Sequence, residues 1–457
     1  MSTADAGIDL RAPAPIDIAA FVDEQPVGRL HIRLLLLCAA VLFMDGFDTQ
    51  AMGYVAPDLT RDWQLARGAL GPAFSAGLFG LMIGALVLGP VADRIGRKRI
   101  IVWSAVAFGL GTVATTFASD LHGLTVIRFL TGLGLGGAMP NTVALMAEFS
   151  PRHRRATLVM IMFCGFSVGA AVGGLVAAAL IPAFGWRSVF LVGGIAPLLF
   201  APVLARALPE SIRFLAAADG RENARIARLL SLLAPTVQIP PNARFVVNEP
   251  GHARMPVAEL FAAGGAATTL LIWVVFFMSL LDLYLLSNWL PTLLNELGAS
   301  ISVSAAIGAL LQVGGFVGAL TLGKFIDRFS FRALALTYLV ASFAIVALGF
   351  SGHSIPLAAV AIACAGFCIV GGQTASNALA ATYYPTRVRS TGVGWALGIG
   401  RIGSIIGPLA GGMILARQAG VGTLFMSAAV PALLAAIASF ALSRTTTFAS
   451  ACERAPT

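Results

Sequence analysis

The chain has 457 residues, of which 58% are hydrophobic and only 11% are charged. This composition exceeds what the core of a water-soluble domain can bury, so the whole chain is neither a soluble enzyme nor a soluble binding module. The formal net charge of +9 would suit nucleic acid, but the basic residues lie in short connections between apolar stretches. The sequence therefore predicts an all-α membrane protein that contacts lipid and binds no nucleic acid.

Twelve apolar stretches follow one another along the chain, each long enough to cross a hydrocarbon core of roughly 30 Å as a helix. We expect membrane-spanning helices at 34–57, 69–91, 100–118, 122–145, 157–181, 187–206, 266–294, 302–325, 332–351, 356–381, 390–416 and 421–442. Their boundaries are placed where polar residues begin, which locates a helix end to within about four residues.

Polar segments flank and divide these helices. Residues 1–33 are acidic in part and have no basic n-region, which predicts a tail rather than a cleaved signal peptide. Residues 207–265 are rich in Pro and Arg and separate two six-helix halves, 34–206 and 266–442. Residues 443–457 form a second tail.

The basic residues predict the orientation in the membrane. Outside the predicted helices, most of the 30 Lys and Arg residues lie on the side of both tails. The exceptions on the opposite side are Arg61, Arg67, Arg187 and Arg417. By the positive-inside rule, both termini and residues 207–265 are cytoplasmic, as in a multi-pass protein of a bacterial-type cytoplasmic (inner) membrane.

The two halves repeat each other at a constant offset of 234 residues. In the first helix of each half, the offset places Val41, Phe43, Met44, Asp48, Pro57 and Leu59 on Val275, Phe277, Met278, Asp282, Pro291 and Leu293. It also places Gly80 and Gly84 on Gly314 and Gly318, and Gly169 and Gly173 on Gly403 and Gly407. Such small-xxx-small pairs let membrane helices approach closely, so the repeat predicts two equivalent halves.

Motifs within this repeat carry a family resemblance. The connection after the second helix reads Gly89-Pro-Val-Ala-Asp93-Arg94-Ile-Gly96-Arg97-Lys98, with a weaker copy at 323–328. It resembles the loop signature of the major facilitator superfamily, which implies that helices one, four, seven and ten line a central cavity. Asp45-Gly46-Phe47-Asp48-Thr49-Gln50 and Asn288-Trp289-Leu290-Pro291 resemble the aromatic acid:proton symporters. This implies proton-coupled uptake of an aromatic carboxylate, such as 4-hydroxybenzoate or protocatechuate, by alternating access in aromatic catabolism.

Patterns that would indicate an enzyme or a cofactor fail in context. The G-x-G-x-x-G run at 132–137 lies in an apolar helix rather than after a strand. At 318–325, Phe325 stands where a phosphate-binding loop requires Ser or Thr. The five histidines show no paired metal-ligand spacing. We therefore expect no enzyme activity, no metal and no cofactor, with the proton gradient as the energy source.

Ionisable residues lie deep in the predicted membrane. Asp45 is twelve residues beyond Arg33, about 18 Å along a helix and so near the bilayer centre, and Asp48 lies one turn further on the same face. A charge there costs a few kcal/mol unless it is paired or hydrated. Asp45 and Asp48 are candidates for proton coupling or, alternatively, for an ion pair that fixes helix positions. Arg128 can partner either carboxylate or an anionic substrate.

Other polar residues within the helices are candidates for substrate binding. Asp282, which the repeat aligns with an aspartate of the first helix, handles substrate or a proton, or is only inherited by common ancestry. Arg401 has no charged mate in the first half, which favours carboxylate binding. Gln373 and Asn377 can bind a hydroxyl group or hold helices together. Trp289 can stack on an aromatic ring or simply pack.

The loop motif and the helix ends near it predict a conformational gate. The family resemblance implies a cytoplasmic ion-pair network that closes in one state and breaks in the other; alternatively, these charges only set topology. The expected gate residues are Gly89, Asp93, Arg94, Gly96, Arg97, Glu148, Arg155, Asp327, Arg328 and Arg389. Ser330 replaces the glycine found at position 96, which weakens the gating role of the second copy.

These residues suggest a coupling hypothesis for a monomeric transporter. A protonated Asp45/Asp48 pair releases Arg128, which binds the carboxylate of an entering aromatic acid; proton loss inside restores the Asp–Arg pair. A monoanion with one proton carries no net charge, whereas a second proton would add the membrane voltage as a driving force. The alternatives are a proton symporter for another organic acid or a sugar, and a membrane-embedded enzyme or sensor. The last would need a nucleophile with a base, a metal cluster or a signalling domain.

Overall fold

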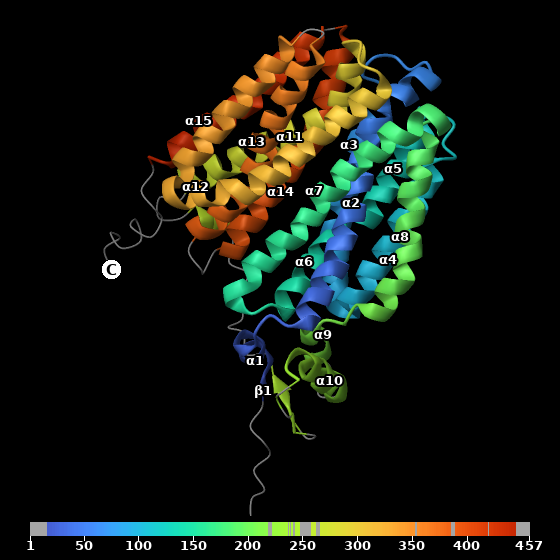
Figure 1. The fold of residues 1–457 in the computed structure, drawn as a ribbon. Helices are drawn as coiled ribbons and strands as arrows, with labels where there is room; N and C mark the ends of the chain where they lie inside the picture. The colour runs from blue at the N-terminus through green and yellow to red at the C-terminus, as the bar shows by residue number, and fades with distance from the viewer. Residues whose placement is uncertain are drawn as a thin grey trace, which may run out of the picture.

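The computed structural model describes residues 16–217, 222–235, 237, 239–240, 243–246, 257–261, 266–351, 354–384, 389–418 and 420–444. Most of these residues are helical, and the long helices form two bundles that lie beside each other (Figure 1). The bundles correspond to the two predicted halves. The all-α architecture expected from the sequence is confirmed.

The first bundle contains six membrane crossings. Its helices are α2 (Arg29–Asp62), α3 (Gly71–Ile95), α4 (Arg97–Thr115), α5 (Leu121–Leu135), α6 (Ala138–Phe149), α7 (Arg152–Phe184) and α8 (Arg187–Ala207). The fourth predicted crossing is divided into α5 and α6 at Gly136 and Gly137. Both glycines keep right-handed helical φ and ψ angles, so α5 and α6 form one crossing with a local interruption.

The second bundle also contains six crossings. Its helices are α11 (Ala266–Glu296), α12 (Ile301–Gly349), α13 (Ile355–Tyr383), α14 (Arg389–Ala416) and α15 (Val421–Leu442). α12 joins two predicted crossings across a kink at Ser330. Ten helical segments of the described chain are long and apolar enough to cross a membrane. α4, which begins with three basic residues, and the interrupted α5–α6 pair supply the other two crossings.

The turn after the loop motif is present in both halves. Gly96 has φ 104° and Ser330, its repeat mate, has φ 47°, so both positions break the helix with a left-handed residue. Glycine suits position 96 because of this positive φ, and a Cβ there would also lie 2.5 Å from a carboxylate oxygen of Glu210. Ser330 retains the turn without glycine, at a strain of order 1–3 kcal/mol. The substitution that distinguishes the two sequence motifs therefore leaves the turn in place.

The glycine pairs confirm the repeat as a pattern of contacts. A Cβ on Gly80 would lie 2.1 Å from the carbonyl oxygen of Phe129, and a Cβ on Gly314 would lie 2.2 Å from that of Ala363. Phe129 and Ala363 are themselves 234 residues apart. The same relation links Gly84 to Leu133 and Gly318 to Phe367, and Gly169 to Phe43 and Gly403 to Phe277. Helices approach this closely only where no side chain intervenes.

Short elements precede α2 or lie between α8 and α11, where the sequence predicted only a tail and a linker. They are β1 (Ile16–Asp17), α1 (Ile18–Glu24), α9 (Ile212–Ala216), α10 (Asn223–Leu233), β2 (Phe245–Val246) and the 3-10 helix η1 (Val257–Leu260). β1 pairs with β2 in parallel, and apolar residues of α1 and α10 join one core cluster with α2 and α6. We call the end of the molecule that carries α1, α9 and α10 the linker end, and the opposite end, at the α2–α3 connection, the far end (Figure 1).

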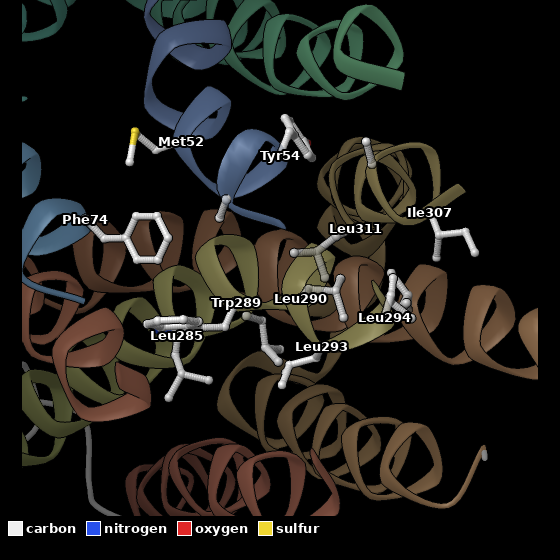
Figure 2. Packing of buried hydrophobic residues seen from close by; sticks show 14 of the residues in the cluster. Met52, Tyr54, Phe74, Leu285, Trp289, Leu290, Leu293, Leu294, Ile307 and Leu311 are labelled. Carbon is white, nitrogen blue, oxygen red and sulfur yellow. The ribbon is translucent and has the colours of Figure 1, made fainter. Parts of the chain in front are cut away.

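The two bundles share a hydrophobic core toward the far end. Figure 2 shows part of this cluster, in which Met52, Tyr54 and Phe74 of the first bundle meet residues of α11 and α12 such as Trp289 and Leu311. At the linker end, the buried apolar residues form one cluster within the first bundle and another within the second. In the described part of the chain, the bundles are therefore packed together at the far end and separate toward the linker end.

Candidate functional site

A buried ion pair joins α2 to α5. The Arg128 guanidinium donates to both carboxylate oxygens of Asp48, with Nη1 3.2 Å from Oδ1 and Nη2 3.0 Å from Oδ2. The hydroxyl of Thr112 on α4 donates to the same carboxylate at 2.6 Å. Asp48 is 1% exposed and Arg128 is 5% exposed. Paired hydrogen bonds of this kind are the geometry in which a buried charge pair is best compensated. The sequence left Asp45, Asp48 or an anionic substrate as possible partners of Arg128. In the structure, Arg128 is paired with Asp48.

Asp45 lies one turn before Asp48 but makes different contacts. Its carboxylate accepts a hydrogen bond from the Thr49 hydroxyl at 3.1 Å. Its other oxygen is buried and has no hydrogen-bond donor among the described residues. Within the described residues, no salt bridge joins Asp45 to Arg128 or to Arg401. The two aspartates therefore do not share one arginine in this conformation.

Arg401 reaches from α14 toward the first bundle. Its Nη1 donates to the Tyr284 hydroxyl of α11 at 3.4 Å, and its Nη2 lies 3.8 Å from the sulfur of Met139 on α6. Within the described ranges, no carboxylate forms a salt bridge with it. Because a guanidinium has five N–H donors, most of those on Arg401 remain available. Arg401 thus differs from Arg128, whose donors face Asp48.

A pocket lies beside the ion pair. In this conformation its enclosed space is small, about 20 Å³, and its walls come from α2, α3, α5 and α11. The lining includes Met52, Phe74 and Leu78 as well as Asp48 and Arg128. Mostly apolar walls with one charged corner suit a small molecule that has an apolar body and an ionised group. The three apolar residues were not singled out from sequence, because one apolar residue in a membrane helix looks like another.

Of the predicted substrate-binding residues, only Arg128 lines this pocket; Arg401, Asp282, Gln373, Asn377 and Trp289 lie outside its lining. Asp282 of α11 is 1% exposed, and neither of its carboxylate oxygens has a hydrogen-bond partner among the described residues. Gln373 donates to Asn377 at 3.4 Å along α13. Gln373 is buried and Asn377 is exposed, so the pair runs from the interior of the second bundle to its surface.

Trp289 lies in the core that the bundles share. Its indole N–H donates to the carbonyl oxygen of Pro408 at 2.8 Å, and its ring meets Phe74 edge-on with centroids 5.1 Å apart (Figure 2). The side chain is fully buried. Of the two interpretations of Trp289 from sequence, packing describes its place in this conformation, because no face of the ring is free to stack on a ligand.

The linker end carries an ion-pair network within the first bundle. Arg97 Nη1 lies 2.8 Å from Glu148 Oε1, and Arg97 Nη2 lies 3.5 Å from Asp93. Glu148 also accepts a hydrogen bond from the Ser211 hydroxyl at 2.6 Å and lies 3.8 Å from Arg213. Because all these residues belong to the first bundle or to the segment after it, the network does not bridge the bundles in this conformation.

Further contacts of this network were missed from sequence. Asp23 of α1 pairs with Arg152 at 3.0 Å and lies 4.0 Å from Arg155. Glu210 accepts the backbone N–H of Lys98 at 3.1 Å. Asp23 and Glu210 come from the segments before α2 and after α8. Their sequence positions carry no sign that they fold back onto the loop motif.

Three of the other expected gate residues, Gly89, Arg94 and Arg328, make few contacts. Space around Gly89 is open, and Arg94 is exposed. Arg328 is also exposed and stacks over the neighbouring phenylalanine ring at 5.3 Å. The side chains of Asp327 and Arg389 lie outside the described part of the structure.

At the far end, the contact between the bundles is polar as well as apolar. Arg67, before α3, donates from Nε to Glu296 of α11 at 3.0 Å. Gly68 and Gly412 touch through their backbones, because a Cβ on Gly412 would lie 2.7 Å from the carbonyl oxygen of Gly68. The sequence placed these residues at helix ends but did not indicate that they meet.

The close approach at Gly412 supports a prediction. Gly412→Val should disfavour closure of the far end by about 1–3 kcal/mol, since the added atoms meet backbone, and this is roughly a five- to 150-fold change in population. Since the sequence predicts a carrier that works by alternating access, we expect both net uptake and exchange of substrate to fall, because each needs the far end to close. Gly398→Val is the matched control on the same helix, since a Cβ there meets nothing within 4 Å. Equal transport by the two variants would contradict the prediction.

Two repeated six-helix bundles, packed together at one end and holding buried charges and a pocket, define a multi-pass membrane transporter whose halves move against each other. A family model described as Major Facilitator Superfamily matches residues 38–269 and 272–454. The chain belongs to the major facilitator superfamily. This membership agrees with the resemblance carried by the loop motif and places the chain among transporters rather than enzymes.

Curated relatives are similar over nearly their whole length. A gallate transporter of Pseudomonas putida is 44% identical over 94% of this chain and 95% of its own. The 4-hydroxybenzoate transporter PcaK of Pseudomonas aeruginosa is 43% identical over 94% of this chain and 96% of its own. A 3-(3-hydroxy-phenyl)propionate transporter of Escherichia coli is 38% identical over 88% of this chain.

Solved structures share the fold. A bacterial homologue of the human lysosomal transporter Spinster, in an inward-facing and unoccupied conformation, superposes with a TM-score of 0.70 at 19% identity, covering 93% of this chain and 99% of that one. The xylose transporter XylE from E. coli, in a partially occluded inward open conformation, has a TM-score of 0.70 at 16% identity, covering 90% of this chain and 97% of that one.

Proposed function

We propose that this chain imports aromatic monocarboxylates of the 4-hydroxybenzoate, protocatechuate or gallate type together with protons. The observation that carries the proposal is the pocket beside Asp48 and Arg128, whose apolar walls suit a ring and whose charged corner suits a carboxylate. The relatives named as gallate and 4-hydroxybenzoate transporters support the same substrate class. The proton gradient supplies the energy, and no other cofactor takes part.

In this proposal, the linker end faces the cytoplasm of a bacterium. The positive-inside rule supports this orientation, because most basic residues outside the membrane lie at that end. Both termini and residues 207–265 are then cytoplasmic, and the protein works as a monomer in the inner membrane. Since the bundles are packed at the far end and apart toward the linker end, the conformation described above corresponds to an inward-facing state.

Coupling rests on competition for Arg128. In the outward-facing state, a proton held by Asp45 and Asp48 frees Arg128, which then binds the substrate carboxylate. After the halves rock, the proton leaves to the cytoplasm, Asp48 recaptures Arg128, and the substrate is displaced. The bidentate Asp48–Arg128 pair supports this order, because it is the arrangement expected after release. Arg401 attracts the same anion from the second bundle.

The charges at the linker end act as the inner gate in this cycle. Arg97 and Glu148 hold the loop motif of the first half in place, and Asp23 holds the start of α7 through Arg152. When the linker end closes, this ordered surface meets the copy of the motif in the second half, which contains Asp327 and Arg328. The gate therefore depends on ion pairs within the first half, because these pairs order the surface that contacts the second half when the linker end closes.

The test is accumulation of labelled 4-hydroxybenzoate by proteoliposomes with an imposed pH gradient, acidic outside. Accumulation should disappear with a protonophore. Unlabelled benzoates should compete, whereas phenylpropionates should compete less, and dicarboxylates and sugars should not. Failure to accumulate the label, or competition by sugars or aliphatic acids but not by benzoates, would refute the proposed substrate class.

A further inference from the structure

Asp282 is a carboxyl group buried in the second bundle without a partner. It lies midway along α11, is 1% exposed, and has no hydrogen-bond donor to either oxygen among the described residues. An ionised carboxylate in such a place is strongly disfavoured, because no charge or dipole replaces its lost hydration. A neutral carboxylic acid is the form that the site accommodates.

The internal repeat explains why Asp282 lacks a cation. Its mate in the first half is Asp48, which is held by Thr112 and Arg128. At the offset of 234 residues, Thr112 corresponds to Val346 and Arg128 corresponds to Ile362. Both replacements are apolar. The second half therefore keeps the aspartate of the repeat but has lost the two side chains that compensate its charge.

Among the described residues, no cationic group contacts Asp282. Tyr338 on α12 donates its hydroxyl to Ser279 at 2.8 Å, one turn before Asp282, and contacts Ser376 at 3.0 Å. α13 carries the buried thiol of Cys368 and has no Lys, Arg or His along its length. Arg401 on α14 is hydrogen-bonded two residues further along α11, to the Tyr284 hydroxyl.

The two remaining neighbours of α11 supply no cation either. α15 has no ionisable side chain along its length. On α2, the basic residues Arg29, His31, Arg33 and Arg61 lie near the two ends, whereas Asp45 and Asp48 near its middle are acidic, and Asp48 is already paired with Arg128. Asp282 therefore faces apolar groups, hydroxyls and a thiol.

We propose that Asp282 is a second proton-carrying site, so that each aromatic monoanion enters with two protons. Asp282 takes up a proton from the outside while the far end is open, carries it as a neutral acid through every conformation in which it is buried, including the one described above, and releases it to cytoplasmic water when the linker end opens further. This inference rests on the proposed function, in which the Asp48–Arg128 pair handles the first proton. Two protons and one monoanion move one positive charge inward, so uptake responds to membrane voltage.

The first test asks whether Asp282 is protonated. Infrared spectra of the purified wild type should contain a carboxylic acid C=O band that is lost in Asp282→Asn. The variant should unfold at the wild-type temperature, because it replaces one neutral group with another of the same shape. Asp62→Asn, at the far end of α2, is the matched control and should keep the band. A band unchanged in Asp282→Asn, or a large drop in its unfolding temperature, would overturn the proposal.

The second test asks whether that proton is transported. Proteoliposomes without a pH gradient receive an inside-negative potassium diffusion potential, and labelled 4-hydroxybenzoate is the probe. With one net charge per cycle, a roughly tenfold potassium gradient supports up to roughly tenfold accumulation by the wild type. Asp282→Asn should lose this accumulation yet still accumulate the label when a pH gradient is imposed. Asp62→Asn should behave as the wild type.

The outcomes separate the two proposals. A wild type that accumulates the label with a pH gradient but ignores voltage, or an Asp282→Asn variant that keeps the full voltage response, refutes the second proton site alone. A wild type that accumulates the label under neither gradient refutes the proposed function, while the infrared result still decides the protonation of Asp282.

Discussion

Asp48→Asn is expected to abolish net uptake, to retain exchange of labelled for unlabelled substrate, and to lower the free energy of unfolding by about 3–5 kcal/mol. The Arg128 side chain is 6% exposed and would lose its anionic partner. A guanidinium does not give up its proton inside a protein, so the charge would stay buried and uncompensated. A loaded carrier can pair Arg128 with the substrate carboxylate, whereas an empty carrier cannot. Exchange needs only the loaded carrier, but net uptake also needs the empty one to return.

The measurements are unfolding of the purified variant and parallel assays of net uptake and exchange. The control is the double variant Asp48→Asn, Arg128→Met, which removes both charges. It should recover most of the lost stability, because replacing both members of a buried ion pair by uncharged residues is often neutral for the free energy of unfolding. The double variant should not transport uphill. Wild-type net uptake by Asp48→Asn would contradict the coupling role of the pair.

Arg128→Met alone should cost less stability than Asp48→Asn. The carboxyl group left behind can take up a proton and become neutral, whereas the guanidinium left by the other variant cannot lose one. Unfolding curves of the two single variants and the wild type compare these costs directly, and a larger loss of stability in Arg128→Met would contradict the prediction.

The architecture was predictable because its cause is visible along the chain. Membrane helices can be recognised from their length and hydropathy, and the repeat can be recognised from residues that are identical at one constant offset. The pairing of Gly80 with Phe129, and of Gly314 with Ala363, shows that this offset also predicts contacts. What the sequence did not indicate was local geometry, such as the interruption at Gly136 or the kink that merges two crossings at Ser330.

The sequence indicated which charged residues lie buried in the helices, but not how they pair. Asp45 and Asp48 are one turn apart, so periodicity alone assigns them one role, yet only Asp48 faces the arginine on α5. Thr112 decides this environment together with Arg128, and it was missed because a threonine in a membrane helix often bonds only to its own backbone. Arg67 and Glu296 were missed for a different reason, since two residues in separate connections reveal their distance only in the folded chain.

Arg401→Gln is expected to raise the KM for 4-hydroxybenzoate roughly 10- to 150-fold while leaving the free energy of unfolding nearly unchanged. Its guanidinium has no salt bridge to a described carboxylate and donates to Tyr284 only at 3.4 Å, so little folding energy depends on it. A charge-assisted hydrogen bond to the substrate carboxylate contributes about 1.5–3 kcal/mol, which is the stated range in affinity. Initial rates of uptake as a function of substrate concentration measure the effect.

Arg401→Lys and Arg417→Gln complete this comparison. Arg401→Lys keeps the positive charge but lacks the planar guanidinium, so the KM of this variant should lie between the KM of the wild type and that of Arg401→Gln. Arg417 is exposed at the far end, and its replacement should leave KM unchanged. If Arg401→Gln also leaves KM unchanged, the anion depends on Arg128 alone, and the carrier must break the Asp48 pair before it can attract substrate. If KM rises as expected, Arg401 attracts the anion first, and the approaching carboxylate then competes with Asp48 for Arg128.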